Sequence, residues 1–175
     1  RVKILAAERD ARASKERERS LAADEHEHGI AGDGVVVTRG VTQCCLVLAD
    51  GWYEWQVAAG GKQPWFVRLR DPRPIAFAGL WERWKDPARG ELLESCTIVT
   101  TDASESIRKI HDRMPVVLPE QSWDRWMDPA YSDTEALSKT LGPYDASALQ
   151  AWQVSRLVNA PKNEGSKLIE AEGGS

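Results

Sequence analysis

Apolar and β-branched runs, separated by turn residues, dominate the chain from residue 44 onward. Runs of this length, bounded by glycine, proline and aspartate, are typical of β-strands. The predicted strands cover residues 44–48, 52–56, 64–70, 75–84 and 95–101, with a last one near 152–155. The turns between the first four contain Asp50-Gly51, Gly60-Gly61 and the proline-rich segment 71–74. Because the run at 44–48 is apolar at every position, it is typical of a buried strand.

Three short helices are expected among these strands. The first ends at residue 109, and the others cover residues 120–127 and 134–141. Asp102 or Ser104 can cap the first helix, and Pro115 prevents it from continuing far beyond His111. Many strands with a few short helices predict an α+β fold whose core is a curved, barrel-like and mostly antiparallel sheet.

The first 43 residues do not continue this strand pattern. They hold eight basic and eight acidic side chains, and Val2, Ile4, Leu5 and Leu21 are too few for a strong apolar stripe on a helix, which predicts a solvated helix or a partly disordered segment. His26 and His28 lie two positions apart and do not share a helix face, so we expect no metal site there. We therefore divide the chain into an N-terminal segment, residues 1–43, and one domain, residues 44–175.

The length of the chain, its cysteine content and the length of its apolar runs limit the classes of protein to which it can belong. A chain of 175 residues suits one domain with a substantial core, and we expect a monomer. Three cysteines, at 44, 45 and 96, are an odd number without zinc spacing. Cys96 falls in the strand predicted at 95–101 and is expected to be a small core residue. We therefore expect no disulfide framework, no metal or other cofactor, and a reducing compartment, the cytoplasm. No apolar run approaches the length of a membrane span and no secretory signal begins the chain, so we expect no membrane association.

The formal net charge of −4 gives no overall attraction to nucleic acid, but residues 62–85 reverse it locally. This segment holds six basic and two acidic side chains, with five aromatic residues among them. Basic and aromatic side chains together can form a groove for single-stranded nucleic acid, in which phosphates are neutralised and bases stack. The alternative is a half-buried sheet with a charged outer face.

Two short segments carry the candidate chemistry. In IHDRMP, residues 110–115, the unperturbed pKa of His111 lies near neutrality, Asp112 could orient the ring, and Arg113 offers a planar fork for carboxylate or phosphate. In ADGWYEW, residues 49–55, three aromatic residues surround Glu54 and should raise its pKa by desolvation. A histidine and an acid of this kind are typical of proton transfer, although 110–115 alone could also be a solvated surface turn.

These two segments and several others occur in the order found in the SOS response-associated peptidase (SRAP) family, which the chain resembles from about residue 45 to 169. The matching segments are CLVLADGWYEW at 45–55, AGLWE at 78–82, TT at 100–101, HDRMP at 111–115, VS at 154–155, VN at 158–159 and NEG at 163–165. The resemblance implies a compact β-barrel-like core with helices around it. It also implies recognition of abasic sites in single-stranded DNA.

The same resemblance assigns roles to individual residues. Glu54 would move protons between a terminal amine, the sugar and a thiol, and His111 would assist opening of the sugar ring and stabilise developing charge. The residues beside these motifs are expected to face the DNA: Trp55, Thr100, Thr101 and Arg113.

Covalent chemistry in this family depends on an N-terminal cysteine, which condenses with the ring-opened sugar aldehyde to form a thiazolidine. The sequence begins with Arg1, and no copy of the family's opening cysteine segment is found in it. The nitrogens of Cys44 and Cys45 are amides and cannot condense with an aldehyde. We therefore expect crosslinking only where an N-terminal cysteine precedes this domain, and at most slow imine-based lyase activity from the amine of Arg1.

Two other functions remain open at this point. The first is a thiol-dependent peptidase or amidase, in which Cys44 or Cys45 would act near His111 and Glu54. A strand cysteine followed by Leu46-Val47-Leu48 is more typical of a buried and inert thiol. The second is a catalytically inactive module that only binds DNA or protein.

Overall fold

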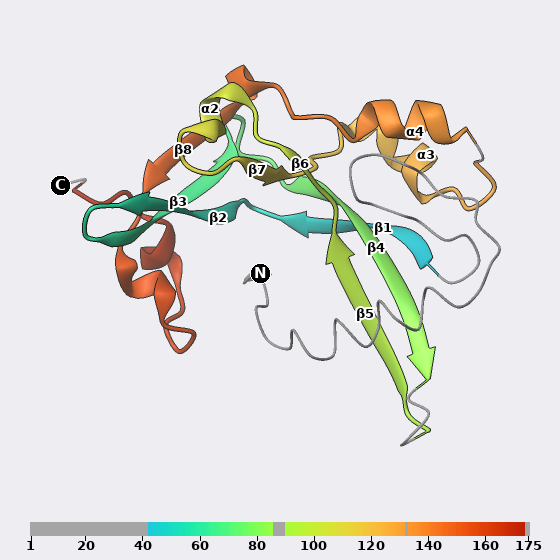
Figure 1. Cartoon of the computed structure of the whole chain (residues 1–175), viewed down its shortest axis with the longest axis horizontal. Helices are drawn as coiled ribbons and strands as arrows, with labels where there is room; N and C mark the ends of the chain where they lie inside the picture. The colour runs from blue at the N-terminus through green and yellow to red at the C-terminus, as the bar shows by residue number, and fades with distance from the viewer. Residues whose placement is uncertain (1–41, 86–89, 132, 174–175) are drawn as a thin grey trace.

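The computed structural model describes residues 42–85, 90–131 and 133–173 (Figure 1). The predicted N-terminal segment, residues 1–43, therefore lies almost entirely outside the described residues. The strands are β1 (Thr42–Ala49), β2 (Trp52–Ala58), β3 (Gly61–Leu69), β4 (Ile75–Lys85), β5 (Leu92–Ile98), β6 (Thr100–Asp102), β7 (Arg113–Pro115) and β8 (Leu149–Gln153). The α-helices are α2 (Glu105–Arg108), α3 (Trp123–Met127) and α4 (Thr134–Thr140). Short 3-10 helices are η1 (Glu120–Ser122), η2 (Ala146–Ala148), η3 (Arg156–Asn159) and η4 (Ser166–Ile169).

The strands form three antiparallel sheets, with strand orders β1-β4-β5, β2-β3-β8 and β6-β7. The predicted α+β, mostly antiparallel architecture is confirmed. The described strands form separate sheets and do not close into a barrel, and β4 connects the β1-β4-β5 sheet to the β6-β7 ribbon. Backbone hydrogen bonds make this junction: Val99 N–H donates to Ala78 at 2.9 Å, and Ala78 N–H donates to Val116 at 3.0 Å.

The turn at Asp50-Gly51 transfers the chain from one sheet to another, since β1 pairs with β4 whereas β2 pairs with β3. A Cβ atom at Gly51 would lie 2.3 Å from the carbonyl oxygen of Val67 and 2.6 Å from the Phe66 ring. The backbone can therefore approach β3 this closely only because residue 51 has no side chain. This approach fixes where β2, and with it Glu54, begins.

Three apolar clusters stabilise the arrangement. The largest lies between the sheets and α2 and includes Trp52, Phe77 and Ile107, which are all almost fully buried. A second cluster joins β4 to α3 and α4 around Trp126, whose indole N–H donates to the Cys45 carbonyl at 2.9 Å. The third packs β2 and β3 against the C-terminal 3-10 segments, which lie below these strands in Figure 1. The side chains on the two faces of β2 therefore have different surroundings.

The structure differs from the sequence predictions at several places. The strand predicted at 95–101 is divided between β5 and β6, which belong to different sheets, and β7 was not predicted. The 44–48 run is a strand, but its side chains are only half-buried and Leu48 is 54% exposed. Cys96, expected in the core, is exposed. The last strand is Leu149–Gln153 rather than 152–155, because Val154 begins the turn into η3 and forms only an isolated bridge with Ala171.

Candidate functional site

Glu54 lies on the inner face of β2, together with Trp52 and Gln56, because alternate residues of a strand share a face. The Trp52 indole N–H donates to Glu54 Oε1 at 3.2 Å. Burial raises the pKa of the Glu54 carboxyl above its ordinary value; the nearby His111 and the Trp52 hydrogen bond oppose this rise, and Asp112 adds to it. The structure therefore brings Glu54 within electrostatic reach of His111, 57 residues later in the sequence, and a shared role of the two in catalysis stays a prediction.

His111 lies in the four-residue link, residues 109–112, between the end of α2 and the start of β7. Ile107 and Ile110 are buried and fix the helix end in the core. The Ala103 N–H donates to the Asp112 carbonyl at 2.8 Å, which fixes the other side of the link. Ser104 is the N-cap residue of α2, as predicted, but its hydroxyl makes no capping hydrogen bond.

The His111 ring can exist in two hydrogen-bonded forms at this position. In the neutral ring, Nδ1 accepts the Arg113 backbone N–H at 3.1 Å, which leaves the ring proton on Nε2. In the charged ring, Nδ1–H can donate to Asp112 Oδ1 or to the Arg113 carbonyl, each 3.2 Å away. With 45% of its side chain exposed, His111 can exchange protons with solvent or with a bound molecule.

Gln56 connects the strand that carries Glu54 to the helix end that carries His111. Its amide Nε2 donates to the Lys109 carbonyl at 2.7 Å, and its Oε1 accepts from the Trp65 indole at 3.2 Å. The sequence analysis missed this residue. The alternation of β2 was the available signal, since Gln56 is two positions from Glu54 and so must share its face.

The four residues expected to face the DNA differ from one another in position and in their contacts within the protein. The Arg113 guanidinium donates to Asp102 Oδ1 at 2.9 Å, to the Thr100 carbonyl at 2.9 Å and to Thr100 Oγ1 at 3.2 Å. Thr101 pairs with the buried Met114 across β6 and β7, so it lies on the opposite face of this ribbon from Arg113. Trp55 lies on the outer face of β2, where its indole N–H donates to Asn159 Oδ1 at 2.8 Å. Contact of these residues with DNA stays a prediction.

The basic segment 62–85 is distributed over two sheets, since β3 and β4 belong to different ones. Arg83 pairs with Glu94 at 2.6 Å, and Arg73 pairs with Asp71 at 3.5 Å. The Arg68 guanidinium lies over the Trp152 ring, 5.3 Å from its centroid. Fewer of the six basic side chains in this segment are therefore available to a single groove than their number in the sequence indicated.

The cysteines lie in the β1-β4-β5 sheet, away from Glu54. Cys45 Sγ is 3.7 Å from Cys96 Sγ, and a Cβ atom at Gly79 would come within 2.7 Å of the Cys45 sulfur. Burial, and secondarily the hydrogen bond and charges of neighbouring thiols, raise the pKa of Cys45 to about 12. Neither Cys44 nor Cys45 is among the groups that shift the pKa of Glu54.

Two further findings concern ligands and membranes. Among the described residues, no group of three or more His, Cys, Asp and Glu side chains is arranged to hold a metal ion. The described part of the chain also contains no helix of the length and apolarity that crossing a membrane requires.

Comparison with known proteins gives one consistent family. The SOS response associated peptidase (SRAP) model matches residues 38–161. The abasic site processing protein YoqW of Bacillus subtilis is 42% identical over 132 residues, which cover 75% of this chain and 58% of YoqW. The abasic site processing protein HMCES of Gallus gallus is 36% identical over 139 residues, which cover 69% of this chain and 41% of HMCES.

A solved structure of a protein from Bacteroides thetaiotaomicron shares the fold, with a TM-score of 0.66 and 26% identity over 74% of this chain and 57% of that one. The chain thus spans less than two thirds of the length of these relatives. Because the SRAP model covers most of the described domain and the relatives are up to 42% identical, the chain belongs to the SRAP family.

Proposed function

We propose that the protein binds abasic sites in single-stranded DNA at the Glu54–His111 site. One observation carries the proposal: a partly buried carboxyl of raised pKa lies within electrostatic reach of a histidine that solvent can also reach. The names of YoqW and HMCES, both abasic site processing proteins, supply the substrate class. The proposal also includes a monomeric state and a cytoplasmic location, which the free thiols Cys45 and Cys96 suit.

The chemistry of an abasic sugar explains why two proton-transfer groups are useful. Its ring-closed form opens to an aldehyde when a proton is added to the ring oxygen and another is removed from the anomeric hydroxyl. Glu54, with its raised pKa, holds a proton closer to neutral pH than an ordinary glutamate and is suited to donate one. The neutral His111 ring is suited to accept the other proton.

The open aldehyde can then react with a terminal amine, which forms an imine and releases water. Where that amine belongs to an N-terminal cysteine, addition of its thiol to the imine carbon closes a thiazolidine. Our proposal for the described domain is therefore recognition of the abasic sugar, with thiazolidine formation where an N-terminal cysteine precedes the domain.

The thiol-dependent peptidase is the weaker alternative. A thiol nucleophile acts as the thiolate, and the pKa of Cys45, raised to about 12, keeps this sulfur protonated at neutral pH. A thiol peptidase also needs a base within hydrogen-bond reach of the sulfur. The described groups that act on the Cys45 thiol are the thiols of Cys96 and Cys44, and neither is a histidine or a carboxylate.

The test is binding of the 175-residue chain to three labelled oligonucleotides: single-stranded with an abasic site, single-stranded and intact, and duplex with an abasic site. Fluorescence anisotropy should show the tightest binding to the first. His111→Ala and Glu54→Gln should reduce ring opening, measured as aldehyde or imine trapped by borohydride, by about a hundredfold.

Glu135→Gln is the matched control, because this glutamate is exposed on α4 and pairs only with Lys139 at 2.9 Å. It should leave both binding and trapping unchanged. Equal affinity for intact and abasic strands would refute the proposed function. Size-exclusion chromatography with light scattering tests the monomeric state.

A further inference from the structure

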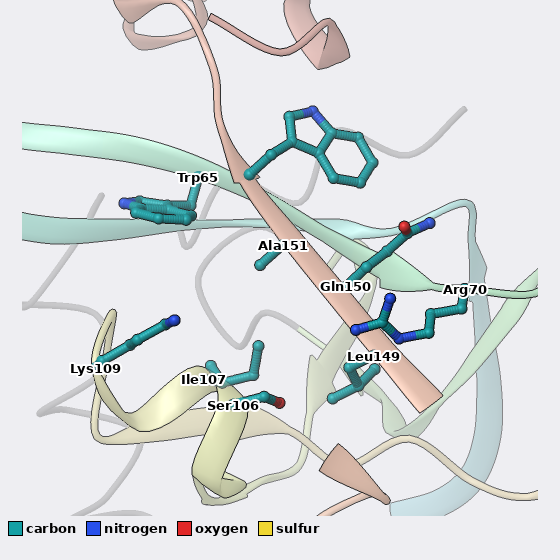
Figure 2. A pocket seen from close by; sticks show the side chains of 9 residues that line it. Trp65, Arg70, Ser106, Ile107, Lys109, Leu149, Gln150 and Ala151 are labelled. Carbon is teal, nitrogen blue, oxygen red and sulfur yellow. The ribbon is translucent and has the colours of Figure 1, made fainter. Parts of the chain in front are cut away.

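A pocket of about 350 Å³ opens beside the Glu54–His111 site, between the edge strand β8 and helix α2 (Figure 2). Polar and aromatic side chains form most of its lining: Trp65, Arg70, Ser106, Lys109, Gln150 and Trp152. Figure 2 shows Trp65 and Lys109 at one end of the pocket and Arg70 with Gln150 at the other. The sequence analysis did not bring these residues together, because they come from β3, the end of α2 and β8.

The pocket is not lined by Glu54 or His111 themselves, but residues that line it are close neighbours of both. Trp65 is the cross-strand partner of Glu54, so both side chains project from the same face of the sheet. Lys109 is two residues before His111, and Gln56 joins Trp65 to the Lys109 carbonyl through its two hydrogen bonds. A strand of DNA whose abasic sugar lies at Glu54 and His111 would therefore place a neighbouring nucleotide at this pocket.

The walls of the pocket have the chemistry that a nucleotide requires. Trp65 is half-buried and offers an aromatic surface on which a base can stack. Arg70 donates from Nε to the Ser147 carbonyl at 2.9 Å, and Lys109 is exposed. Within the described residues, neither cation forms a salt bridge with a carboxylate, so both charges are available to phosphate.

We propose that this pocket binds the nucleotide adjacent to the abasic sugar in the same strand, with its base on Trp65 and its phosphates at Lys109 and Arg70. The inference rests on the proposed function and adds a second contact region to it. It predicts that tight binding requires an intact neighbouring nucleotide on one side of the abasic site. Because stacking and phosphate contact do not read base edges, the pocket should accept any base.

The test combines variants of the protein with truncations of the DNA. Single-stranded oligonucleotides carry the abasic site in the middle, at the 5′ end or at the 3′ end, and anisotropy measures their affinity for the whole 175-residue chain. One of the two truncations should weaken binding to the wild-type protein by roughly tenfold. Lys109→Ala and Trp65→Leu should each weaken binding to the complete oligonucleotide about five- to tenfold, but hardly affect binding to that truncated one.

Salt dependence provides an independent measurement. Lys109→Ala should reduce the slope of log affinity against log salt concentration by about 0.7, the value for one phosphate contact on a single strand. Lys139→Ala, which removes an exposed lysine on α4, is the matched control and should change neither affinity nor slope. Thermal unfolding checks that Trp65→Leu remains folded, and Lys109→Ala tests the pocket without altering its packing.

Each outcome bears on a different claim. If the wild-type chain does not distinguish abasic from intact strands, the proposed function fails and this inference fails with it. If it does distinguish them, but the variants lose equal affinity for complete and truncated oligonucleotides, the inference alone is overturned. Loss confined to the complete oligonucleotide and one truncation supports the pocket and also identifies the side of the abasic site that it serves.

Discussion

Arg113 connects β6 to β7, and the same guanidinium is the predicted phosphate contact. Its two terminal nitrogens are occupied by Asp102 and by the carbonyl and hydroxyl oxygens of Thr100. The side chain of Arg113 is 37% exposed and that of Asp102 is 73% exposed, so solvent screens their ion pair. A DNA phosphate at this position would have to share the guanidinium with Asp102. This competition makes the role of Arg113 measurable.

The stability cost of Arg113→Ala follows from these contacts. An exposed ion pair contributes about 0.2–1 kcal/mol, and the bonds to Thr100 contribute about 1 kcal/mol more. A loss of about 1–2 kcal/mol should lower Tm by roughly 3–6 °C for a domain of this size. If Arg113 also contacts a phosphate, the same variant should weaken DNA binding and reduce the salt slope by about 0.7.

Asp102→Asn separates the two roles of Arg113. It keeps an oxygen acceptor for the guanidinium but removes the negative charge that competes with phosphate. We expect a stability loss of at most about 1 kcal/mol and an affinity for single-stranded DNA that is up to about fivefold higher. Arg113→Lys keeps the charge without the planar fork, so it should lose stability but retain the salt slope.

The assay is anisotropy over a series of salt concentrations, with differential scanning calorimetry on the same samples. A purely structural role would give a lower Tm for Arg113→Ala, an unchanged salt slope, and no gain in affinity for Asp102→Asn. That combination would refute a phosphate contact at Arg113. A raised affinity for Asp102→Asn together with a reduced slope for Arg113→Ala would support it.

Three further predictions concern the carboxyl, the glycine contact and the thiols. Because folding raises the pKa of Glu54, the fold favours its protonated form, and Glu54→Gln, which keeps an acceptor for Trp52, should increase the free energy of unfolding at neutral pH. That gain should disappear as the pH falls below the ordinary value of 4.5, which urea titrations at pH 4 and pH 7 would reveal. Gly79→Ala should destabilise the protein by about 1–3 kcal/mol, and adding Cys45→Ala should restore part of this, because the new Cβ would lie 2.7 Å from the Cys45 sulfur. With its pKa raised to about 12, Cys45 should have a thiolate fraction at pH 8 roughly a thousandfold below that of an ordinary thiol, so iodoacetamide followed by peptide mapping should label it far more slowly than the exposed Cys96.

Local patterns predicted the α-helices and most of the strands, because these depend on neighbours in the sequence, but they did not predict β7, which pairs with β6 through the tertiary fold. The β2–β3 hairpin at Gly60-Gly61 and the helix that ends before His111 both follow from turn and proline chemistry. The assignment of strands to sheets could not be predicted in the same way. The close approach of the Gly51 backbone to β3, where a Cβ atom would lie 2.3 Å from the Val67 carbonyl, accompanies the change of sheet between β1 and β2 and is visible only in the structure.

The residues of the candidate site show the same difference between what local sequence predicts and what depends on the tertiary fold. Glu54 and His111 could be named from the sequence because their own neighbours carry the motif. The partners that position them could not, since Gln56 contacts Lys109 only through the tertiary fold. For the same reason Cys96 was expected in the core: an apolar strand pattern does not show which strand will lie at the edge of a sheet.

The two faces of β2 set a geometric condition on how DNA can be bound. Glu54 projects toward His111, whereas Tyr53 and Trp55 project toward the C-terminal segments, where Tyr53 donates to the Leu168 carbonyl at 3.3 Å and Trp55 donates to Asn159. A DNA strand that contacts both Glu54 and Trp55 must therefore pass around the edge or the end of this sheet. A DNA strand that runs from Glu54 to Trp65 stays on one face of the sheet. The second path needs no bend around the sheet, and it leaves Trp55 to hold the C-terminal segments against β2.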